Sequence, residues 1–223
     1  MKLLFITATN TNIGKTYTTL KLIDTLANRS ISVGICKPIE TGVETQAHDA
    51  FKLLTSVQSY NKNFKNLREK EITAYTFPLP AAPFCADTNQ TIKIDIIKNK
   101  IVELSKLCDI LIIEGAGGLM VPITKDYMMI DLIQELNAKT LLVTPSKLGC
   151  INDTLLSIEA LNNRKIDFDW CVNIFEDSKE FKEVTKPFYD EAFPTWWSIQ
   201  DGLDDFVDLI LHPINKVDSS SIA

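Results

Sequence analysis

The chain has 223 residues, of which 45% are hydrophobic and 23% are charged, and these values are ordinary for a globular protein. This length predicts one domain that folds without disulfides or a structural metal, and the composition excludes a disordered, collagen-like or coiled-coil protein. The 23 basic and 29 acidic residues give a formal net charge of −6, so nothing points to a nucleic-acid partner, whose phosphates attract an excess of basic side chains.

The apolar runs and the cysteines of the chain indicate its cellular compartment. No apolar run approaches the roughly 20 residues of a membrane-spanning helix, and the apolar start of the chain is too short for a signal peptide. The five cysteines are odd in number and no two are spaced as Cys-x-x-Cys, which indicates reduced thiols. We therefore expect a cytoplasmic protein without a membrane partner. The two histidines, His48 and His212, are too few for a multi-histidine metal centre.

Short apolar runs alternate with segments of helical periodicity along the chain. Strands are predicted at 3–7, 31–36, 109–113, 140–143 and 168–174, and helices at 15–28, 92–107 and about 152–161. Strands that alternate with helices favour βαβ units. We expect an α/β fold in which a single, mostly parallel sheet carries helices on both faces.

Three segments depart from this alternation. Residues 59–71 are polar and rich in Asn and Lys, which predicts a surface loop or an exposed helix end. The prolines within residues 78–83 predict an ordered, extended loop. Because no change of composition marks a second domain, we expect one domain over residues 1–217 and a flexible tail at 218–223.

A Gly-Lys-Thr sequence lies between the first predicted strand and the first predicted helix. Backbone N–H groups at a helix N-terminus favour a bound anion, Lys15 adds positive charge for phosphates, and the Thr16 hydroxyl can ligate Mg²⁺. Five residues separate Ala8 from Gly14, which predicts a longer variant of the nucleotide-binding P-loop in which Ala8 avoids a positive φ. The alternative is that Gly14 only ends the strand and that Lys15 and Thr16 are solvated.

Charged residues follow two more of the predicted strands, and ligands of open parallel sheets bind beyond the carboxyl ends of the strands. Lys37 follows the strand at 31–36, where it can place charge on a phosphoryl or carboxylate group. Glu114 follows the strand at 109–113, with three glycines close behind it. A carboxylate there needs a partner, and Mg²⁺ opposite the P-loop is the natural one. A surface lysine and a solvated glutamate are the alternatives.

Four further residues are candidates by their positions. Lys147 lies in a glycine-containing turn whose N–H groups can bind a carboxylate or which only turns the chain. Asn173 ends the last predicted strand, where its amide can read a purine edge or be only a turn residue. Asp49 lies at an expected helix start, where it can reach the same Mg²⁺ or only cap the helix. Cys150 has no histidine or second cysteine nearby in sequence, so we do not expect a nucleophile.

Together these motifs resemble the dethiobiotin synthetase family, in the family's order and over about residues 1–173. The matching segments are Thr9–Thr16, Lys37-Pro38-x-x-Thr41-Gly42, Tyr75-Thr76-Phe77 followed by Pro80 and Pro83, Glu114-Gly115-Ala116-Gly117-Gly118 and Lys147-Leu148-Gly149-Cys150-Ile151-Asn152. The resemblance implies a P-loop NTPase-like fold, a homodimer and a cyclo-ligase of biotin biosynthesis. Such an enzyme makes dethiobiotin from 7,8-diaminononanoate, CO₂ and ATP, with ADP and phosphate as the other products.

The resemblance also assigns roles to residues. It implies Lys37, Lys15 and Thr11 as catalytic residues, and Thr16, Asp49 and Glu114 as ligands of Mg²⁺. The implied nucleotide-binding residues are Asn12, Ile13, Gly14, Lys15, Thr16, Tyr17, Asp49, Glu114, Gly115, Ala116, Gly117 and Asn173. The implied substrate-binding residues are Thr11, Lys37, Thr41 and Gly118, with Gly149, Cys150 and Asn152 of the other subunit at the carboxylate tail of the substrate.

The chain departs from the family pattern at three places. Ala8 replaces the first glycine of the loop, Asn12 stands where the family often has Glu, and residues 196–200 replace a Gly-x-x-Pro-type segment near the base. The last departure predicts weak discrimination among nucleotide bases.

Three other classes of protein share parts of this pattern. A P-loop switch ATPase that acts through protein partners carries a signature lysine where this chain has Asn10. A cobyrinic-acid-type amidotransferase needs a second, glutaminase domain, for which this chain has no room. A non-catalytic nucleotide-binding module leaves Lys37 and Glu114 unexplained.

Overall fold

The computed structural model describes residues 2–175 and 178–212. Its largest sheet has the strand order β10-β9-β8-β1-β5-β2, and every neighbouring pair is parallel. The strands are β1 (Lys2–Ala8), β2 (Val33–Cys36), β5 (Ile110–Gly118), β8 (Lys139–Pro145), β9 (Phe168–Asn173) and β10 (Trp197–Ser198). The predicted parallel α/β fold is confirmed.

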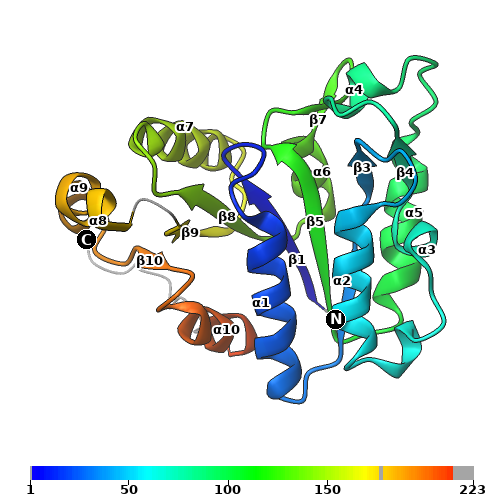
Figure 1. Ribbon diagram of the computed structural model, residues 1–223, viewed down its shortest axis with the longest axis horizontal. Helices are drawn as coiled ribbons and strands as arrows, with labels where there is room; N and C mark the ends of the chain where they lie inside the picture. The colour runs from blue at the N-terminus through cyan, green and yellow to red at the C-terminus, as the bar shows by residue number, and fades with distance from the viewer. Residues whose placement is uncertain (1, 176–177, 213–223) are drawn as a thin grey trace, which may run out of the picture.

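Helices cover both faces of this sheet (Figure 1). The helices α1 (Lys15–Asn28), α2 (His48–Gln58) and α10 (Leu203–Leu211) lie on one face. On the other face lie α5 (Ile94–Ser105), α6 (Met129–Leu136) and α7 (Cys150–Asn163). Right-handed crossovers explain the division, because the chain moves one way from β1 to β2 and the opposite way from β5 to β8 and β9. The central strands are apolar runs because both of their faces are buried.

The order of the strands also decides where a ligand can bind. The first crossover leaves β1 toward β2, whereas the later ones lead to β8 on the other side of β1. This reversal opens a crevice beyond the carboxyl end of β1, which is where open α/β sheets bind ligands. The predicted P-loop, residues 9–14, begins at that point.

Shorter elements complete the described part of the chain. β3 (Ile39–Thr41) pairs in parallel with β4 (Tyr75–Phe77), and β6 (Pro122–Thr124) pairs antiparallel with β7 (Tyr127–Met128). The short helices are η1 (Lys62–Phe64), α3 (Glu69–Ile72), α4 (Pro83–Ala86), α8 (Ser178–Glu180), the π-helical η2 (Phe181–Thr185) and α9 (Lys186–Ala192). No described helix has both the length and the apolar character to span a membrane.

Most expected elements agree with the structure to within a few residues, and α1 agrees at both ends. One strand differs in length: β5 continues through residues 114–118, which the sequence placed after the strand. The reason is pairing, because Gly118 still lies opposite Ala8 of β1 after a shift in register. Residues 78–82 form the expected irregular loop, and Pro83 begins α4. The tail predicted at 218–223 lies outside the described residues.

The polar segment 59–71 is mostly exposed, as expected, but Asn61 and Phe64 are buried. The Asn61 amide donates hydrogen bonds to the carbonyl oxygens of Val33 (2.9 Å) and Leu107 (3.1 Å), at the edge of the sheet where β2 begins. Its side-chain oxygen accepts from the N–H of Asn63. Asn61 therefore holds η1 against the sheet. The sequence gives no sign of this role, because Asn61 is one polar residue among many in this segment.

We expect Asn61→Ala to lower the free energy of unfolding by about 2 kcal/mol, because it removes a buried amide that donates to the Val33 and Leu107 carbonyl groups, of which Leu107 alone keeps the Asn63 amide as a donor. Asn63→Ala is the matched control, since the Asn63 amide donates to Leu107 from an exposed position. It should cost less than about 1 kcal/mol. Urea unfolding of both variants measures the difference, and equal losses would contradict the role of Asn61.

Candidate functional site

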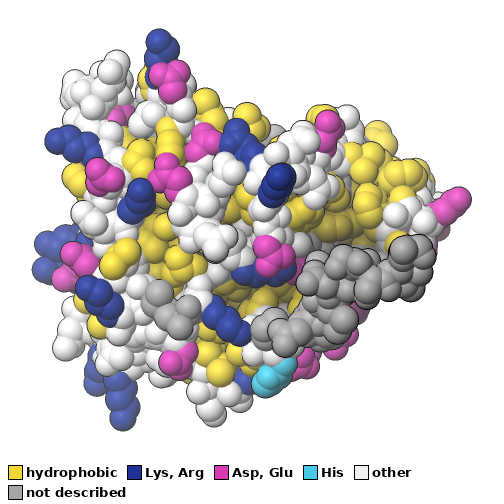
Figure 2. All heavy atoms as spheres, turned by 180° about the vertical axis from the view of Figure 1, so that it is seen from behind, with side chains coloured by type: hydrophobic (Ala, Val, Ile, Leu, Met, Phe, Trp, Pro, Cys, Tyr) yellow, Lys and Arg dark blue, Asp and Glu magenta, His cyan; other side chains and the backbone are white. Residues whose placement is uncertain are grey.

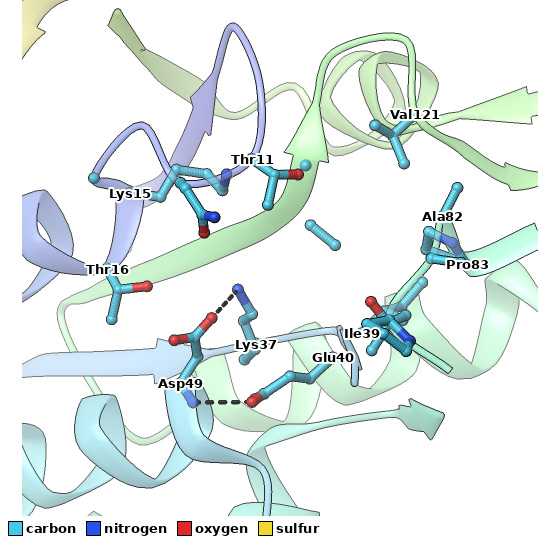
Figure 3. A pocket seen from close by; sticks show the side chains of 17 residues that line it. Thr11, Lys15, Thr16, Lys37, Ile39, Glu40, Asp49, Ala82, Pro83 and Val121 are labelled. Atoms are coloured by element: carbon cyan, nitrogen blue, oxygen red, sulfur yellow. Dashed lines mark hydrogen bonds and ion pairs between the residues drawn. The ribbon is translucent and has the colours of Figure 1, made fainter. Parts of the chain in front are cut away.

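A cavity of about 650 Å³ lies beyond the carboxyl ends of the central strands. Figure 3 shows Lys15 and Thr16 from the first loop and helix, Lys37 and Glu40 from the β2–β3 segment, and Asp49 from α2 around it. The whole lining is Thr11, Asn12, Gly14, Lys15, Thr16, Lys37, Ile39, Glu40, Thr41, Asp49, Pro80, Ala81, Ala82, Pro83, Ala116, Gly117 and Val121. Ten of these residues are among those that the sequence analysis assigned to the site.

The loop between β1 and α1 has the backbone of an anion-binding turn. Gly14 adopts a φ of 103° and Asn12 a φ of 59°, and Gly14 precedes α1 without a side chain that caps the helix. A Cβ atom on Gly14 would lie 2.2 Å from Nδ2 of Asn173 and would displace that amide, while the positive φ favours glycine for conformation. Ala8 belongs to β1 and is not among the residues with a positive φ, as expected.

The side chains that follow Gly14 are held by the protein. The buried Lys15 extends back across the loop and donates from Nζ to the carbonyl oxygen of Asn10 at 3.1 Å. The Thr16 hydroxyl donates to Oε1 of Glu114 at 3.0 Å. The alternative in which Gly14 only ends a strand and both side chains are solvated is therefore wrong.

Lys37, which lines the cavity, forms a buried ion pair with Glu114, which does not line it. Nζ of Lys37 lies 2.7 Å from Oε1 of Glu114 and 3.4 Å from Oδ2 of Asp49. Lys37 is 3% exposed and Glu114 is 0% exposed, so neither is the surface residue that the alternatives allowed. A buried charge needs such a partner, because desolvation of an isolated ion costs several kcal/mol.

Asp49 does not cap α2. The helix begins at His48 after Ala47, so Asp49 is its second residue and the capping alternative is wrong. From this first turn the Asp49 carboxylate points toward Lys37 (Figure 3). The ammonium group thus lies between two carboxylates that come from different elements.

The two lysines differ in their affinity for protons. Burial alone lowers the pKa of Lys37, but the negative charges of Glu114 and Asp49 raise it above the ordinary value, so Lys37 keeps its proton. Burial, together with the positive charge of Lys37, lowers the pKa of Lys15 to about 8. An anionic phosphate beside Lys15 would favour its charged form.

The oxygen atoms around Lys37 fit a magnesium ion. Thr16 offers a hydroxyl and Glu114 and Asp49 offer carboxylates, which are the ligand types that Mg²⁺ prefers. Oε2 of Glu114 is buried and accepts no hydrogen bond, so a polar atom at the centre of the site lacks a partner within the protein. The described residues contain no group of three or more His, Cys, Asp and Glu side chains arranged for a metal. Because Mg²⁺ prefers octahedral coordination, a site on these three residues would need further oxygens from water and phosphate.

The glycine-rich end of β5 brings its backbone close to the loop. The Gly115 carbonyl accepts a hydrogen bond from Lys37 at 3.3 Å, and Ala116 and Gly117 line the cavity. A Cβ atom on Gly118 would lie 2.8 Å from the carbonyl oxygen of Thr9, so this position packs against the P-loop and does not line the cavity.

A second cavity of about 580 Å³ adjoins the first and shares Thr11, Asn12 and Gly14 with it. Its other lining residues are Ile13, Tyr17, Pro145, Ser146, Lys147, Asn173, Phe175 and Gln200. The Asn173 amide donates to the carbonyl oxygen of Ile13 at 2.9 Å. The two cavities can therefore hold a ligand that extends from Lys37 past the P-loop to Asn173.

Three residues expected at the substrate tail lie apart from both cavities. Gly149 and Asn152 are exposed at the start of α7, and the Cys150 thiol is buried. The backbone N–H of Cys150 already donates to the carbonyl oxygen of Lys147 at 3.0 Å. A contact between these residues and a substrate in this crevice needs a second subunit, so their role stays a prediction.

Sequence reasoning missed other residues of the site. Glu40 lies in the wall of the first cavity, and Phe175 and Gln200 lie in the wall of the second. Glu40 stands within the Lys37–Gly42 motif, but its contacts are to backbone groups that no motif indicates. Gln200 lies in the segment where the resemblance ends.

Comparisons with known proteins show the family to which the chain belongs. The family model described as an AAA domain matches residues 2–172. The protein named ATP-dependent dethiobiotin synthetase BioD of Sulfurovum sp. is 63% identical over 206 residues, which are 92% of this chain and 98% of that protein. The protein of the same name from Wolinella succinogenes is 36% identical over 217 residues, 96% of this chain and 100% of its own length.

Solved structures share the fold at low sequence identity. A plasmid partition protein of Borrelia burgdorferi bound to AMPPNP has a TM-score of 0.56 at 10% identity, over 96% of this chain and 99% of that chain. The MinC:MinD cell division protein complex of Aquifex aeolicus has a TM-score of 0.52 at 15% identity, over 96% and 97%. At these identities the likeness shows a P-loop NTPase-like fold and nothing about activity.

We expect Lys37→Met to lower the free energy of unfolding by about 3–5 kcal/mol, because it leaves the Glu114 carboxylate buried without its cation. The double variant Lys37→Met with Glu114→Gln removes both charges and should recover most of that loss. Denaturant unfolding of the single and double variants measures the coupling. Additive losses would mean that the two side chains are not energetically paired.

Proposed function

Because the chain belongs to the dethiobiotin synthetase family, we propose that it converts 7,8-diaminononanoate, CO₂ and ATP into dethiobiotin, ADP and phosphate, a step of biotin biosynthesis. One observation carries this proposal: Lys15 at the start of α1 and Lys37 just after β2 line one cavity, and Glu114 of β5 forms an ion pair with Lys37 there. Transfer of a phosphoryl group depends mainly on positioning and on charges placed around the phosphates, which this cluster offers.

The P-loop would hold the triphosphate. The N–H groups around Gly14 and the ammonium group of Lys15 would bind the phosphate oxygens, and Asn173 would contact the base in the second cavity. Thr16, Asp49 and Glu114 would hold Mg²⁺, which when bound neutralises charge on the phosphates.

Lys37 would act on the reacting atoms, with Thr11 and Thr41 beside the substrate in the same cavity. One amine of the substrate bonds to the carbon of CO₂ and loses a proton, which gives a carbamate. A carbamate oxygen then attacks the γ-phosphorus and ADP leaves. The second amine attacks the carbamate carbon, phosphate leaves and the ring closes. The charged form of Lys37, which Glu114 and Asp49 favour by raising its pKa, would stabilise the negative charge of the carbamate and of the transferring phosphoryl group.

A homodimer would complete the site. Exposed apolar side chains on and next to α7 include Leu148, Leu155 and Leu156, and apolar side chains gather at the end of the molecule that carries α7 and α9 in Figure 2. Burial of this surface against a second copy would bring Gly149, Cys150 and Asn152 to the substrate of the partner.

The compartment is also part of the proposal. None of the five cysteines, all of which lie in the described ranges, forms a disulfide. This is compatible with the cytoplasm, where thiols stay reduced.

A P-loop switch ATPase is the alternative function, and it shares the fold with the partition and cell division proteins. The backbone of Asn10 accepts the hydrogen bond from Lys15 at the position where that class has its signature lysine. The dethiobiotin synthetase reaction fits better, because it gives Lys37 a substrate to act on.

We expect the purified protein to release phosphate and form dethiobiotin only when 7,8-diaminononanoate, bicarbonate, ATP and Mg²⁺ are all present. Lys37→Met should lower kcat by about 100-fold or more with little change in KM for ATP, because it removes a charge that acts in the transition state. A melting curve confirms that the variant is folded at the assay temperature. Phosphate release that does not depend on the diamine would favour the switch ATPase.

We expect weak discrimination among nucleotide bases. The amides of Asn173 and Gln200 already donate to the protein, Asn173 to Ile13 and Gln200 to the Ile174 carbonyl at 2.9 Å. One further hydrogen bond to a base contributes about 0.5–1.5 kcal/mol, so kcat/KM for ATP, GTP and CTP should agree within roughly 10-fold. Steady-state kinetics with each nucleotide measures this, and a strict preference for ATP would contradict it.

A further inference from the structure

Glu40 makes two short hydrogen bonds in the wall of the first cavity. Oε1 accepts from the backbone N–H of Asp49 and Oε2 from that of Ala50, both at 2.9 Å. These are the second and third residues of α2, whereas Glu40 belongs to β3. Its side chain is 7% exposed, and Figure 3 shows it reaching from β3 to the start of the helix. Glu40 thus joins two separate elements inside the site.

The start of α2 needs such a partner. The N–H groups of the first turn of a helix have no acceptors within the helix and are usually bound by the side chain of the preceding residue. Here that residue is Ala47, which has no acceptor. A carboxylate also interacts favourably with the positive end of the helix dipole. Glu40 therefore caps α2 from a distance.

The cap acts on the turn from which Asp49 projects. The N–H of Asp49 is one of the two groups held by Glu40, and the Asp49 carboxylate lies 3.4 Å from Nζ of Lys37. Lys37 and Glu40 are three residues apart in one segment, and Glu40 is fixed there because β3 pairs with β4 in a register that sets it opposite Thr76. One short segment thus carries Lys37 and also anchors the helix that bears Asp49.

We infer that Glu40 is a positioning residue that fixes the first turn of α2 and thereby holds the Asp49 carboxylate against Lys37 and beside the site for Mg²⁺. Both of its oxygens are bound by main-chain groups, so it acts through Asp49 and not by contact with the reacting atoms. This inference rests on the proposed function for the role of Asp49, whereas the capping geometry does not depend on that function.

The first test compares Glu40→Gln with Glu44→Gln. Glu44 is exposed in the loop between β3 and α2, so its replacement removes the same charge from the same segment without touching α2. In the metal-free and nucleotide-free protein, we expect hydrogen exchange of the Asp49 and Ala50 amides to quicken about 10-fold in Glu40→Gln alone, because one of the two acceptors is lost. Exchange in β1 and β5 should be unchanged in both variants.

The second readout is metal binding. With a non-hydrolysable ATP analogue bound, we expect Glu40→Gln to weaken the affinity for Mn²⁺, used as a probe for Mg²⁺, by about 10-fold, as loss of a group that orients a ligand does. The affinity for the analogue in EDTA should not change. Glu44→Gln should match the wild type in both measurements. Equal behaviour of the two variants would overturn the inference.

A rescue variant separates capping from charge. Ala47→Ser adds a hydroxyl at the residue before α2, where it can accept from the N–H of Ala50. In a Glu40→Ala background we expect this change to restore both slow exchange and metal affinity. Restored exchange without restored affinity would mean that the charge of Glu40 acts on the site directly, which would overturn a positioning role.

These measurements need neither the diamine nor turnover. If the wild-type protein makes no dethiobiotin but Glu40→Gln and Glu44→Gln differ as expected, only the proposed function is contradicted. If the wild-type protein makes dethiobiotin but Glu40→Gln and Glu44→Gln have the same amide exchange and the same Mn²⁺ affinity, only this inference is contradicted.

Discussion

The contact between Lys37 and Glu114 connects the register of the sheet to the chemistry of the site. Cys36 of β2 lies opposite Ile113 of β5, so the residues that follow them emerge side by side at the same edge. Ile6 of β1 lies opposite Glu114, which sets the carboxylate between β1 and β2, directly before the chain enters the P-loop. A slip of one residue would turn the side chains of β5 to the opposite face of the sheet. The apolar runs that fix the register therefore also fix the distance between the ammonium group and the carboxylate.

Burial of the charged groups of Lys15, Lys37 and Glu114 costs desolvation free energy. The protein compensates this cost only in part, and the remainder favours a polyanionic ligand. Lys37 is neutralised by two carboxylates, whereas Lys15 hydrogen bonds only to a neutral carbonyl and loses affinity for its proton. Glu114 keeps one buried oxygen without a donor. Within the described part of the protein, the Lys15 ammonium group therefore has no carboxylate bonded to it, and one carboxylate oxygen of Glu114 has no hydrogen-bond donor. A magnesium–triphosphate ligand offers an anion to the first and a cation to the second, so its binding would relieve costs that folding leaves in place.

Much of this arrangement could be predicted because strong local signals coincide with it. The buried strands are long apolar runs, and Lys37, Glu114 and Asn173 were identified by their positions at strand ends. β3 and β4 were not predicted, because a strand of three residues has no measurable period. Glu40 was missed because its partners are backbone groups of residues 49 and 50, which sequence does not display. Asp49 was identified by resemblance, since in sequence it looked like an ordinary helix cap. Gly149, Cys150 and Asn152 lie away from the crevice of their own chain, and rules about strand ends do not say which subunit uses them.

The two cavities differ in how tightly their residues are constrained. In the first cavity, which we propose holds the triphosphate, charges must lie within a few ångströms of fixed oxygens, and the buried side chains of Lys15, Lys37 and Glu114, on or next to the central elements, would supply them. In the second cavity, which we propose holds the base, the wall includes Gln200, which follows the short edge strand β10 and hydrogen bonds to Ile174, the residue after β9. α10 returns to α1 through exposed ion pairs of Arg29 with Asp204 and Asp208, contacts that contribute little individually. A planar base would need shape and apolar surface more than exact charge placement. The sequence motifs stop near residue 173, but the relatives align over 92–96% of this chain, so the likeness to the family continues through the wall of this cavity.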